Sequence, residues 1–270
     1  MQGQSAWTDF KEARFVPVLA QSLLISKASS IARYAYYHVD LNSGGGYNSV
    51  VHVPGSPLNF LRAVERHRRH NFYAFFVDQD LGCVRELIVR PEIEANSERV
   101  AIFHADNSEV LPVVAEFVAA RERNPHHAVG SIVIDPNGYH KGVPWDALRA
   151  FCRAHPKFDL FFNLNIRTYR LERPHIESGE WSAHQLHPLS TFHEWFARPN
   201  WMITPLCQIA GSTWIQCVGR TMRTASVGYS QLGFYDSESD RGRWILDAVN
   251  QPSEREAART APQLPLLSEL

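Results

Sequence analysis

The stretch that indicates the fold of this protein is YAYYHVDLNSGGGYN, residues 34–48. An aromatic run that favours β-structure reaches Asp40 and is soon followed by Gly44, Gly45 and Gly46. Glycine lacks a side chain, so three in a row weaken a helix or strand and favour a sharp turn or a close backbone approach. The stretch therefore predicts a buried strand that passes into a special loop. A flexible surface turn is the alternative interpretation of the glycines.

Four further runs of the same kind follow along the chain: NFYAFFVD (71–78), RVAIFHAD (99–106), GSIVIDP (130–136) and FDLFFNLN (158–165). Most of the five runs are nearly continuous in apolar residues, which is typical of strands buried on both faces of a parallel sheet. The segments between them have helical character, and strand plus helix recurs at the spacing expected for βαβ units. The sequence therefore predicts an α/β fold with a doubly wound, mostly parallel sheet.

The predicted domain organisation follows from the rest of the chain. WMITPLCQIA (201–210) and STWIQCVGRT (212–221) are two more predicted strands, which complete a sheet of about seven. Helices are expected within residues 22–31, 57–70 and 187–200. We expect an N-terminal helical lead-in at residues 1–32, one α/β domain at 33–250 and a polar C-terminal tail at 251–270.

Composition limits the classes of partner. The 270 residues carry a net charge of -1, so there is no bulk attraction to nucleic acid or membrane, and a polyanion would need a local basic patch. The four cysteines are widely spaced and match neither a zinc site nor a disulfide framework, so no metal is expected. A leader peptide and a long apolar run are both missing from the sequence, which predicts a cytoplasmic protein without membrane association.

Polar side chains stand at the end of every predicted strand. They are Asp40 with Asn42, Asp78 with Asp80, Asp106 with Asn107, Asp135 with Asn137, and Asn163 with Asn165. Ligands of an open parallel sheet bind beyond the carboxyl ends of its strands, so these residues are candidates for lining a cleft. At each position, capping of the following helix is the alternative role. Five such strand ends in succession favour a ligand site.

The positions of these residues suit a nucleoside ligand. Asp40 with the Gly44 to Gly46 loop offers backbone for a ligand to lie against, and Asp78 or Asp80 is placed to accept hydrogen bonds from ribose hydroxyls. Asp106 and Asn107 are placed to receive an adenine edge. A nicotinamide dehydrogenase is disfavoured because the GxGxxG fingerprint is missing and the next strand-end acid lies too far along the chain.

The order of these motifs resembles the class I S-adenosylmethionine-dependent methyltransferases over roughly residues 33–220. More narrowly, HVDLNSGGG, GSPLNFLRAV, IDPNG with VPWDAL, and FFNLNIRTYR resemble the three-Cys-motif partner family. The resemblance implies a methyltransferase-type sheet and S-adenosylmethionine as cofactor. The cofactor residues that it implies are Asp40, Asn42, Gly44, Gly45, Gly46, Asp78, Asp80, Asp106 and Asn107.

The motif after the fourth strand departs from the pattern of amino-methylating enzymes, which is Asp or Asn, two prolines and an aromatic residue. Here it reads Asp135-Pro136-Asn137-Gly138-Tyr139, without the second proline and with the aromatic residue one position later. The resemblance implies that Asp135 and Asn137 face the methyl acceptor and that Tyr139 stacks on it. A turn stabilised by proline, asparagine and glycine is the alternative.

Two basic clusters suggest the acceptor. One is RAVERHRRH (62–70), and the other follows the fifth strand at Arg167, Arg170 and Arg173. Together with Asn163 and Asn165 at the end of the fifth strand, Arg167 is a candidate substrate residue, and a nucleic acid is the expected substrate. A solvated helix face is the alternative interpretation of the first cluster. The predicted reaction is methyl transfer to a nucleobase nitrogen of DNA or RNA, and a protein partner could complete the site. The alternative is a non-catalytic partner subunit that binds a cofactor or nucleotide.

Overall fold

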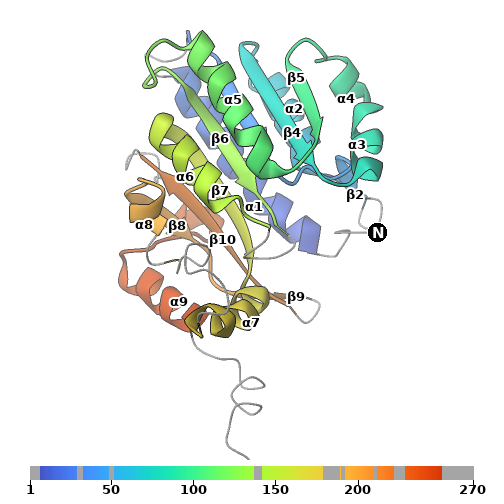
Figure 1. Ribbon diagram of the computed structural model, residues 1–270. Coiled ribbons are helices and arrows are strands. Elements are labelled where there is room, and N and C mark those ends of the chain that lie inside the picture. Colours follow the sequence, from blue (N-terminus) through green and yellow to red (C-terminus); the bar gives the residue numbers. More distant parts are fainter. Residues whose placement is uncertain are drawn as a thin grey trace, which may run out of the picture.

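The computed structural model describes residues 7–28, 33–48, 52–136, 142–178, 189, 192–209, 212–221 and 229–250. Helices cover both faces of a central sheet (Figure 1). The helices are α1 (Trp7–Ala28), α2 (Ser56–Arg66), α3 (Leu81–Ile88), α4 (Pro91–Glu94), α5 (Asn107–Arg121), α6 (Trp145–Ala154), α7 (Ile166–Glu177), α8 (Phe192–Trp195) and α9 (Asp240–Asn250), with a 3-10 turn at Ser230–Leu232. The strands are β1 (Tyr36–Asp40), β2 (Tyr47–Asn48), β3 (Val53–Pro54), β4 (Phe72–Asp78), β5 (Val100–His104), β6 (Val129–Ile134), β7 (Lys157–Asn165), β8 (Asn200–Ile203), β9 (Cys207–Ile209), β10 (Ser212–Arg220) and β11 (Tyr235–Asp236).

The main sheet confirms the predicted doubly wound architecture. Within the described residues it has nine strands, in the order β11-β8-β10-β7-β6-β1-β4-β5, with β9 paired to β10. Strands β5, β4, β1, β6 and β7 are parallel, whereas β10 runs antiparallel to both β7 and β8. The single strand predicted at 201–210 divides into β8 and β9, with Pro205 in the break between them, and β11 is a strand that the sequence did not predict. The five strands predicted from apolar runs all form.

The parallel strands are buried because helices pack on both faces of the sheet. All six residues of β6 are buried, as a continuous apolar run predicts. Helices α5 and α6 contribute to the hydrophobic cluster on one face, and α1 and α2 contribute to the cluster on the other. Alternate strand residues supply each cluster, for example Val39 on the first face and Tyr36 on the second.

Several element boundaries differ from the prediction. The helix expected at 57–70 ends at Arg66 because Arg68 adopts a left-handed backbone conformation with φ of 50°. Helix α1 begins at Trp7, well before the expected start at residue 22. The helix expected within 187–200 is only the four-residue α8 in the described part of that range.

Helices α7 and α9 were not predicted. Strand β7 passes directly into α7 without glycine or proline, and the Asn165 side chain accepts the Arg167 N–H at 3.1 Å to start the helix. Helix α9 lies against α7, since Arg170 donates to the carbonyls of Ala248 and Val249 at 2.7 and 3.1 Å. The expected division into lead-in, domain and tail remains a prediction, and the tail at 251–270 lies outside the described residues.

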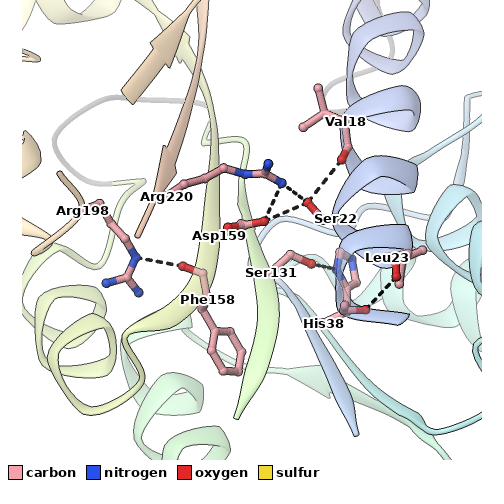
Figure 2. A network of polar contacts seen from close by, with 10 residues as sticks. Val18, Ser22, Leu23, His38, Ser131, Phe158, Asp159, Arg198 and Arg220 are labelled. Atoms are coloured by element: carbon pink, nitrogen blue, oxygen red, sulfur yellow. Dashed lines mark hydrogen bonds and ion pairs between the residues drawn. The ribbon is translucent and has the colours of Figure 1, made fainter. Parts of the chain in front are cut away.

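The amino edge of the sheet, where the parallel strands begin, is held by two buried arginines (Figure 2). Arg220 forms an ion pair with Asp159 at 2.7 Å and also donates to Ser22 of α1. Arg198 donates to the Phe158 carbonyl at 2.8 Å, to the Cys152 and His155 carbonyls around the end of α6, and to the Phe196 and Ala197 carbonyls just after α8. These contacts join α1, α6, α8 and the start of β7 at this edge.

All four cysteines are free thiols; Cys152 and Cys217 are buried, and Cys83 and Cys207 are partly exposed. Among the described helices, none combines the length and apolar character needed to cross a bilayer.

Candidate functional site

The strand order reverses beside β1. The chain continues from β1 through β4 to β5 on one side, and then returns to β6 and β7 on the other. Open α/β sheets bind ligands at such a reversal, beyond the carboxyl ends of the strands. Asp40 ends β1 opposite Phe76 and Val133, so Asp78 and Asp135, two residues farther along their chains, border the same position. The structure therefore brings three of the predicted carboxylates together.

The three predicted loop glycines differ in their surroundings. Gly44 and Gly46 have φ of 59° and 75°, a conformation that favours glycine. A Cβ on Gly46 would lie 2.6 Å from Leu87 Cδ1, and one on Gly45 would lie 2.4 Å from Glu86 Oε2. A Cβ on Gly44 would meet no atom within 4 Å. Two of the glycines thus let the loop pack on α3, and Gly44 presents backbone to open space.

Asp40 is fully buried at the start of this loop. Its carboxylate accepts hydrogen bonds from Ser56 Oγ at 2.5 Å and from the Asn42 N–H at 3.2 Å. Burial raises the pKa of Asp40 to about 7; the carboxylates of Asp135 and Asp78 add to the rise, and the two hydrogen bonds oppose it. Asp40 therefore holds the loop to the start of α2, and its charged form would be stabilised by a nearby cation.

Asp78 and Asp80 have different roles in the structure. Asp78 accepts the Gly44 N–H at 2.8 Å on one oxygen and the Asp80 N–H at 2.8 Å on the other. An ionised carboxylate has about four acceptor positions, so Asp78 keeps hydrogen-bonding capacity for a ligand. Asp80 caps α3 by accepting the N–H groups of Gly82 and Cys83 at 2.7 and 3.3 Å. Capping, the alternative role, is therefore present at Asp80.

The end of β5 carries a cap and an unpaired acceptor. Asp106 caps α5 by accepting the Ser108 N–H at 2.8 Å, and its other oxygen accepts from Gln79 Nε2 at 2.5 Å. Asn107 is 7% exposed, and its Oδ1 has no hydrogen-bond partner among the described residues. A buried acceptor without a donor is costly, so this oxygen is suited to an N–H of a ligand.

The end of β6 is tied to the glycine loop. The backbone N–H of Asp135 donates to Asn42 Oδ1 at 3.1 Å, which fixes the Asn42 side chain between the two strand ends. Asp135 is partly exposed beside this contact. The other two predicted acceptor residues, Asn137 and Tyr139, lie outside the described residues.

The predicted substrate residues at the end of β7 are only in part available to a ligand. Asn163 is buried and accepts from Gln216 Nε2 at 2.8 Å, while Asn165 caps α7 through the N–H groups of Arg167 and Thr168. The Arg167 guanidinium is exposed and forms no hydrogen bond or ion pair with another described residue. Of the three, Arg167 is the one with its side chain open to an anionic partner.

Sequence reasoning missed Ser56 and Gln79. Ser56 fixes the position of Asp40, and Gln79 links the β4 end to the β5 end through Asp106. Gly55 and Pro57 around Ser56 mark a helix start, but the contact with Asp40 on β1, 16 residues earlier, gave no local signal. Gln79 likewise gave no signal, since its partner lies across the sheet.

Comparison with solved structures finds a similar fold. Protein LPL1258 from Legionella pneumophila superposes with a TM-score of 0.53 at 13% identity, over 91% of this chain and 92% of that chain. Cofactor-bound Rv0187 from MTB matches with a TM-score of 0.45 at 12% identity, over 82% of this chain and 83% of that one. Human methyltransferase 10 domain containing protein matches with a TM-score of 0.38 at 9% identity, over 78% and 83%. No protein-family model and no curated protein matches the sequence. The α/β fold with a mostly parallel sheet is as predicted, and membership of the methyltransferases and of the three-Cys-motif partner family remains a prediction.

Proposed function

We propose that this protein transfers a methyl group from S-adenosylmethionine to a nucleobase nitrogen of DNA or RNA. The observation that carries the proposal is the convergence of Gly44, Asp78 and Asp135 where the strand order reverses beside β1. The strand order with its reversed β10 supports it, because this is the sheet type that the sequence resemblance implies.

The residues present at the carboxyl edge suit this cofactor. The unpaired Asn107 Oδ1 can accept a hydrogen bond from the adenine amino group, and the remaining lone pairs of Asp78 can accept from ribose hydroxyls. The open backbone at Gly44 leaves room for the part of the ligand that follows the ribose. Asp40 is buried and positions the glycine loop by accepting the Asn42 N–H. Its negative charge favours the positively charged methionine end of the cofactor on the other side of that loop.

When bound, S-adenosylmethionine supplies an electrophilic methyl group on a sulfonium. The chain then has to hold the acceptor in line and stabilise the charge that develops on it, which positioning and fixed dipoles accomplish. Asp135 would accept a hydrogen bond from the acceptor amine and stabilise its developing positive charge. Arg167 would hold a phosphate of the substrate, and Asn137 and Tyr139 would flank the base.

Calorimetric titration tests the proposal directly. The protein is titrated with S-adenosylmethionine, S-adenosylhomocysteine, NAD and ATP, and the two sulfur compounds are expected to bind selectively. Asn107→Ala and Asp78→Ala should lose this binding, while Asp240→Ala on the distant helix α9 should retain it. If neither sulfur compound binds, the proposal is overturned.

A non-catalytic partner subunit is the second candidate, and the missing second proline after Asp135 favours it. It predicts that S-adenosylmethionine binds but that its methyl group is not transferred. Incubation with labelled S-adenosylmethionine and total RNA or DNA separates the two functions. Label in the nucleic acid supports the enzyme; tight binding without label, also with candidate partner proteins added, supports the partner subunit.

A further inference from the structure

The amino edge of the sheet carries five cations that come from distant parts of the chain, four of them exposed and the fifth, Lys157, half-buried. They are Lys27 at the end of α1, Arg33 before β1, Arg66 and Arg68 at the end of α2, and Lys157 at the start of β7. We refer to these five residues, with Tyr34 and His127, as the amino-edge basic surface. None of the five cations pairs with a carboxylate among the described residues, in contrast to Arg62, which forms an ion pair with Glu92 at 2.7 Å.

Direct contacts join these segments into one surface. Lys27 Nζ donates to the His67 carbonyl at 3.1 Å, and Arg69 donates to the Tyr34 carbonyl at 2.6 Å. The Tyr34 hydroxyl contacts His127 Nε2 at 3.2 Å, so the loop before β6 joins the ends of α1 and α2. Lys157 pairs in register with Val129, which lies beside Tyr36 on β1. The surface therefore runs along the starts of β4, β1, β6 and β7.

Part of this surface is a ready-made stack of planar groups. The rings of Tyr34 and His127 lie 4.0 Å apart and only 14° from parallel. The Arg33 guanidinium lies 4.9 Å from the centre of the Tyr34 ring and donates to the Tyr34 hydroxyl at 2.8 Å. Aromatic rings and guanidinium groups are surfaces on which nucleobases stack. Cations that neutralise phosphates surround it.

The carboxylates of this edge do not cancel its charge. Asp159 is paired with Arg220, and Glu122 accepts the Tyr37 hydroxyl at 3.0 Å. The exposed ones nearby are Glu65, Glu94 and Glu98, and further exposed cations stand along the same edge at Arg99, Arg123 and Arg153. The edge is therefore positive although the whole chain has a net charge of -1.

Arg68 has an unfavourable backbone for an arginine. Its φ of 50° is in the left-handed region, where glycine is the residue without strain. The helix dipole favours a cation at the end of a helix, and Arg66 in the last turn of α2 already supplies one. The dipole therefore does not explain an arginine at the strained position 68. The observation agrees with a use for the Arg68 charge outside the fold.

From this arrangement we infer that the amino-edge basic surface binds single-stranded nucleic acid. The phosphates contact Lys27, Arg33, Arg66, Arg68 and Lys157, and bases stack on the Arg33–Tyr34–His127 group. The surface lies roughly 20 Å, the length of a strand, from the carboxyl edge, so a substrate that uses both must pass around the molecule. The inference does not require methyl transfer or cofactor binding.

Fluorescence anisotropy with labelled single-stranded RNA and DNA of mixed sequence tests it. Binding should weaken with added KCl; the plot of log affinity against log salt concentration should have a slope of about 0.7 per phosphate neutralised, and so roughly 3.5 for five cations. The double variant Arg66→Glu with Arg68→Glu should reduce affinity by about tenfold or more and lower the slope. The control Arg241→Glu with Arg243→Glu changes the net charge equally on the distant helix α9 and should leave binding unchanged.

Arg68→Gly separates binding from folding. It removes the charge and the left-handed strain together, so the melting temperature should rise while the affinity for the oligonucleotide falls. Equal affinity of the wild type and both Arg68 variants would overturn the inference, as would binding to anionic lipid vesicles without binding to either oligonucleotide. Titration of the Arg66 and Arg68 double variant with S-adenosylmethionine reports on the proposed function separately, because that binding uses the opposite edge.

Discussion

The two edges of the sheet use side chains of opposite charge to satisfy backbone hydrogen-bonding groups. At the carboxyl edge, Asp78, Asp80 and Asp106 accept hydrogen bonds from backbone N–H groups of loops and helix starts. At the amino edge, Arg198 donates to the carbonyls of Cys152 and His155, where α6 ends. It also donates to the Phe158 carbonyl of β7, as Figure 2 shows. Helices of a βαβ sheet begin at one edge and end at the other, so free N–H groups gather at the first and free C=O groups at the second.

Comparison of the two edges separates polar residues that stabilise the fold from those that are open to a ligand. A carboxylate that caps a helix, such as Asp80, or a guanidinium whose donors reach backbone carbonyls, such as Arg198, stabilises the fold. One with spare capacity or with an unpaired neighbour, such as Asp78 beside Gly44 or Asn107, is available for binding. Three predictions test this division.

The largest effect is expected for Arg198→Ala. Arg198 is fully buried, and its guanidinium donates to five carbonyls that would lose their partner inside the protein. We expect the free energy of unfolding to fall by about 3 kcal/mol or more, measured by urea denaturation followed by circular dichroism. Arg243→Ala, which removes an exposed arginine, is the control. Equal stability of the two variants would mean that Arg198 does not hold the amino edge.

An intermediate effect is expected for Asp135→Ala at the carboxyl edge. Loss of the group that stabilises the developing charge should lower the rate of methyl transfer about 100-fold and leave the affinity for S-adenosylmethionine nearly unchanged. Single-turnover assays with calorimetry measure both quantities. A parallel loss of rate and affinity would contradict the role given to Asp135, because it would place this residue in the cofactor site.

The smallest effect concerns the pH dependence of stability at Asp40. The pKa of Asp40 is raised to about 7 in the folded protein, so the folded state binds this proton more tightly than the unfolded state. Stability should therefore fall as pH rises from the ordinary carboxyl range to about 7 and level off above it. Between pH 6 and pH 7 the loss should be about 1 kcal/mol relative to Asp40→Asn. Identical pH profiles of wild type and variant would show that burial does not raise the pKa of Asp40 in the folded protein.

The fold could be predicted from sequence because its signals are local. Apolar runs such as GSIVIDP mark strands that are buried on both faces, and β6 is fully buried as expected. Helix α7 could not be predicted in this way, because β7 passes into it without a breaking residue and its start depends on the side chain of Asn165. Boundaries set by a single residue, as at Arg68, were likewise beyond the reach of periodicity.

The candidate site was predictable in position but not in detail. Strand-end residues had to meet at one edge because the strands are parallel, and Asp40, Asp78 and Asp135 do meet there. Which of them caps a helix and which keeps free acceptors depends on the neighbouring backbone. That information appears in the contacts of Asp80 and Asp106, and not in the residue types.

Local signals were enough to predict the five apolar strands, their parallel arrangement and the edge at which the polar residues collect, because apolar runs and strand polarity act along the chain. The folded structure was needed to show that Gly44 faces open space, that Asp40 is buried beside Ser56, and that Lys27, Arg66 and Lys157 share one surface. The reason is physical: burial, hydrogen-bond partners and local charge depend on atoms from distant segments, which come together only when the chain has folded.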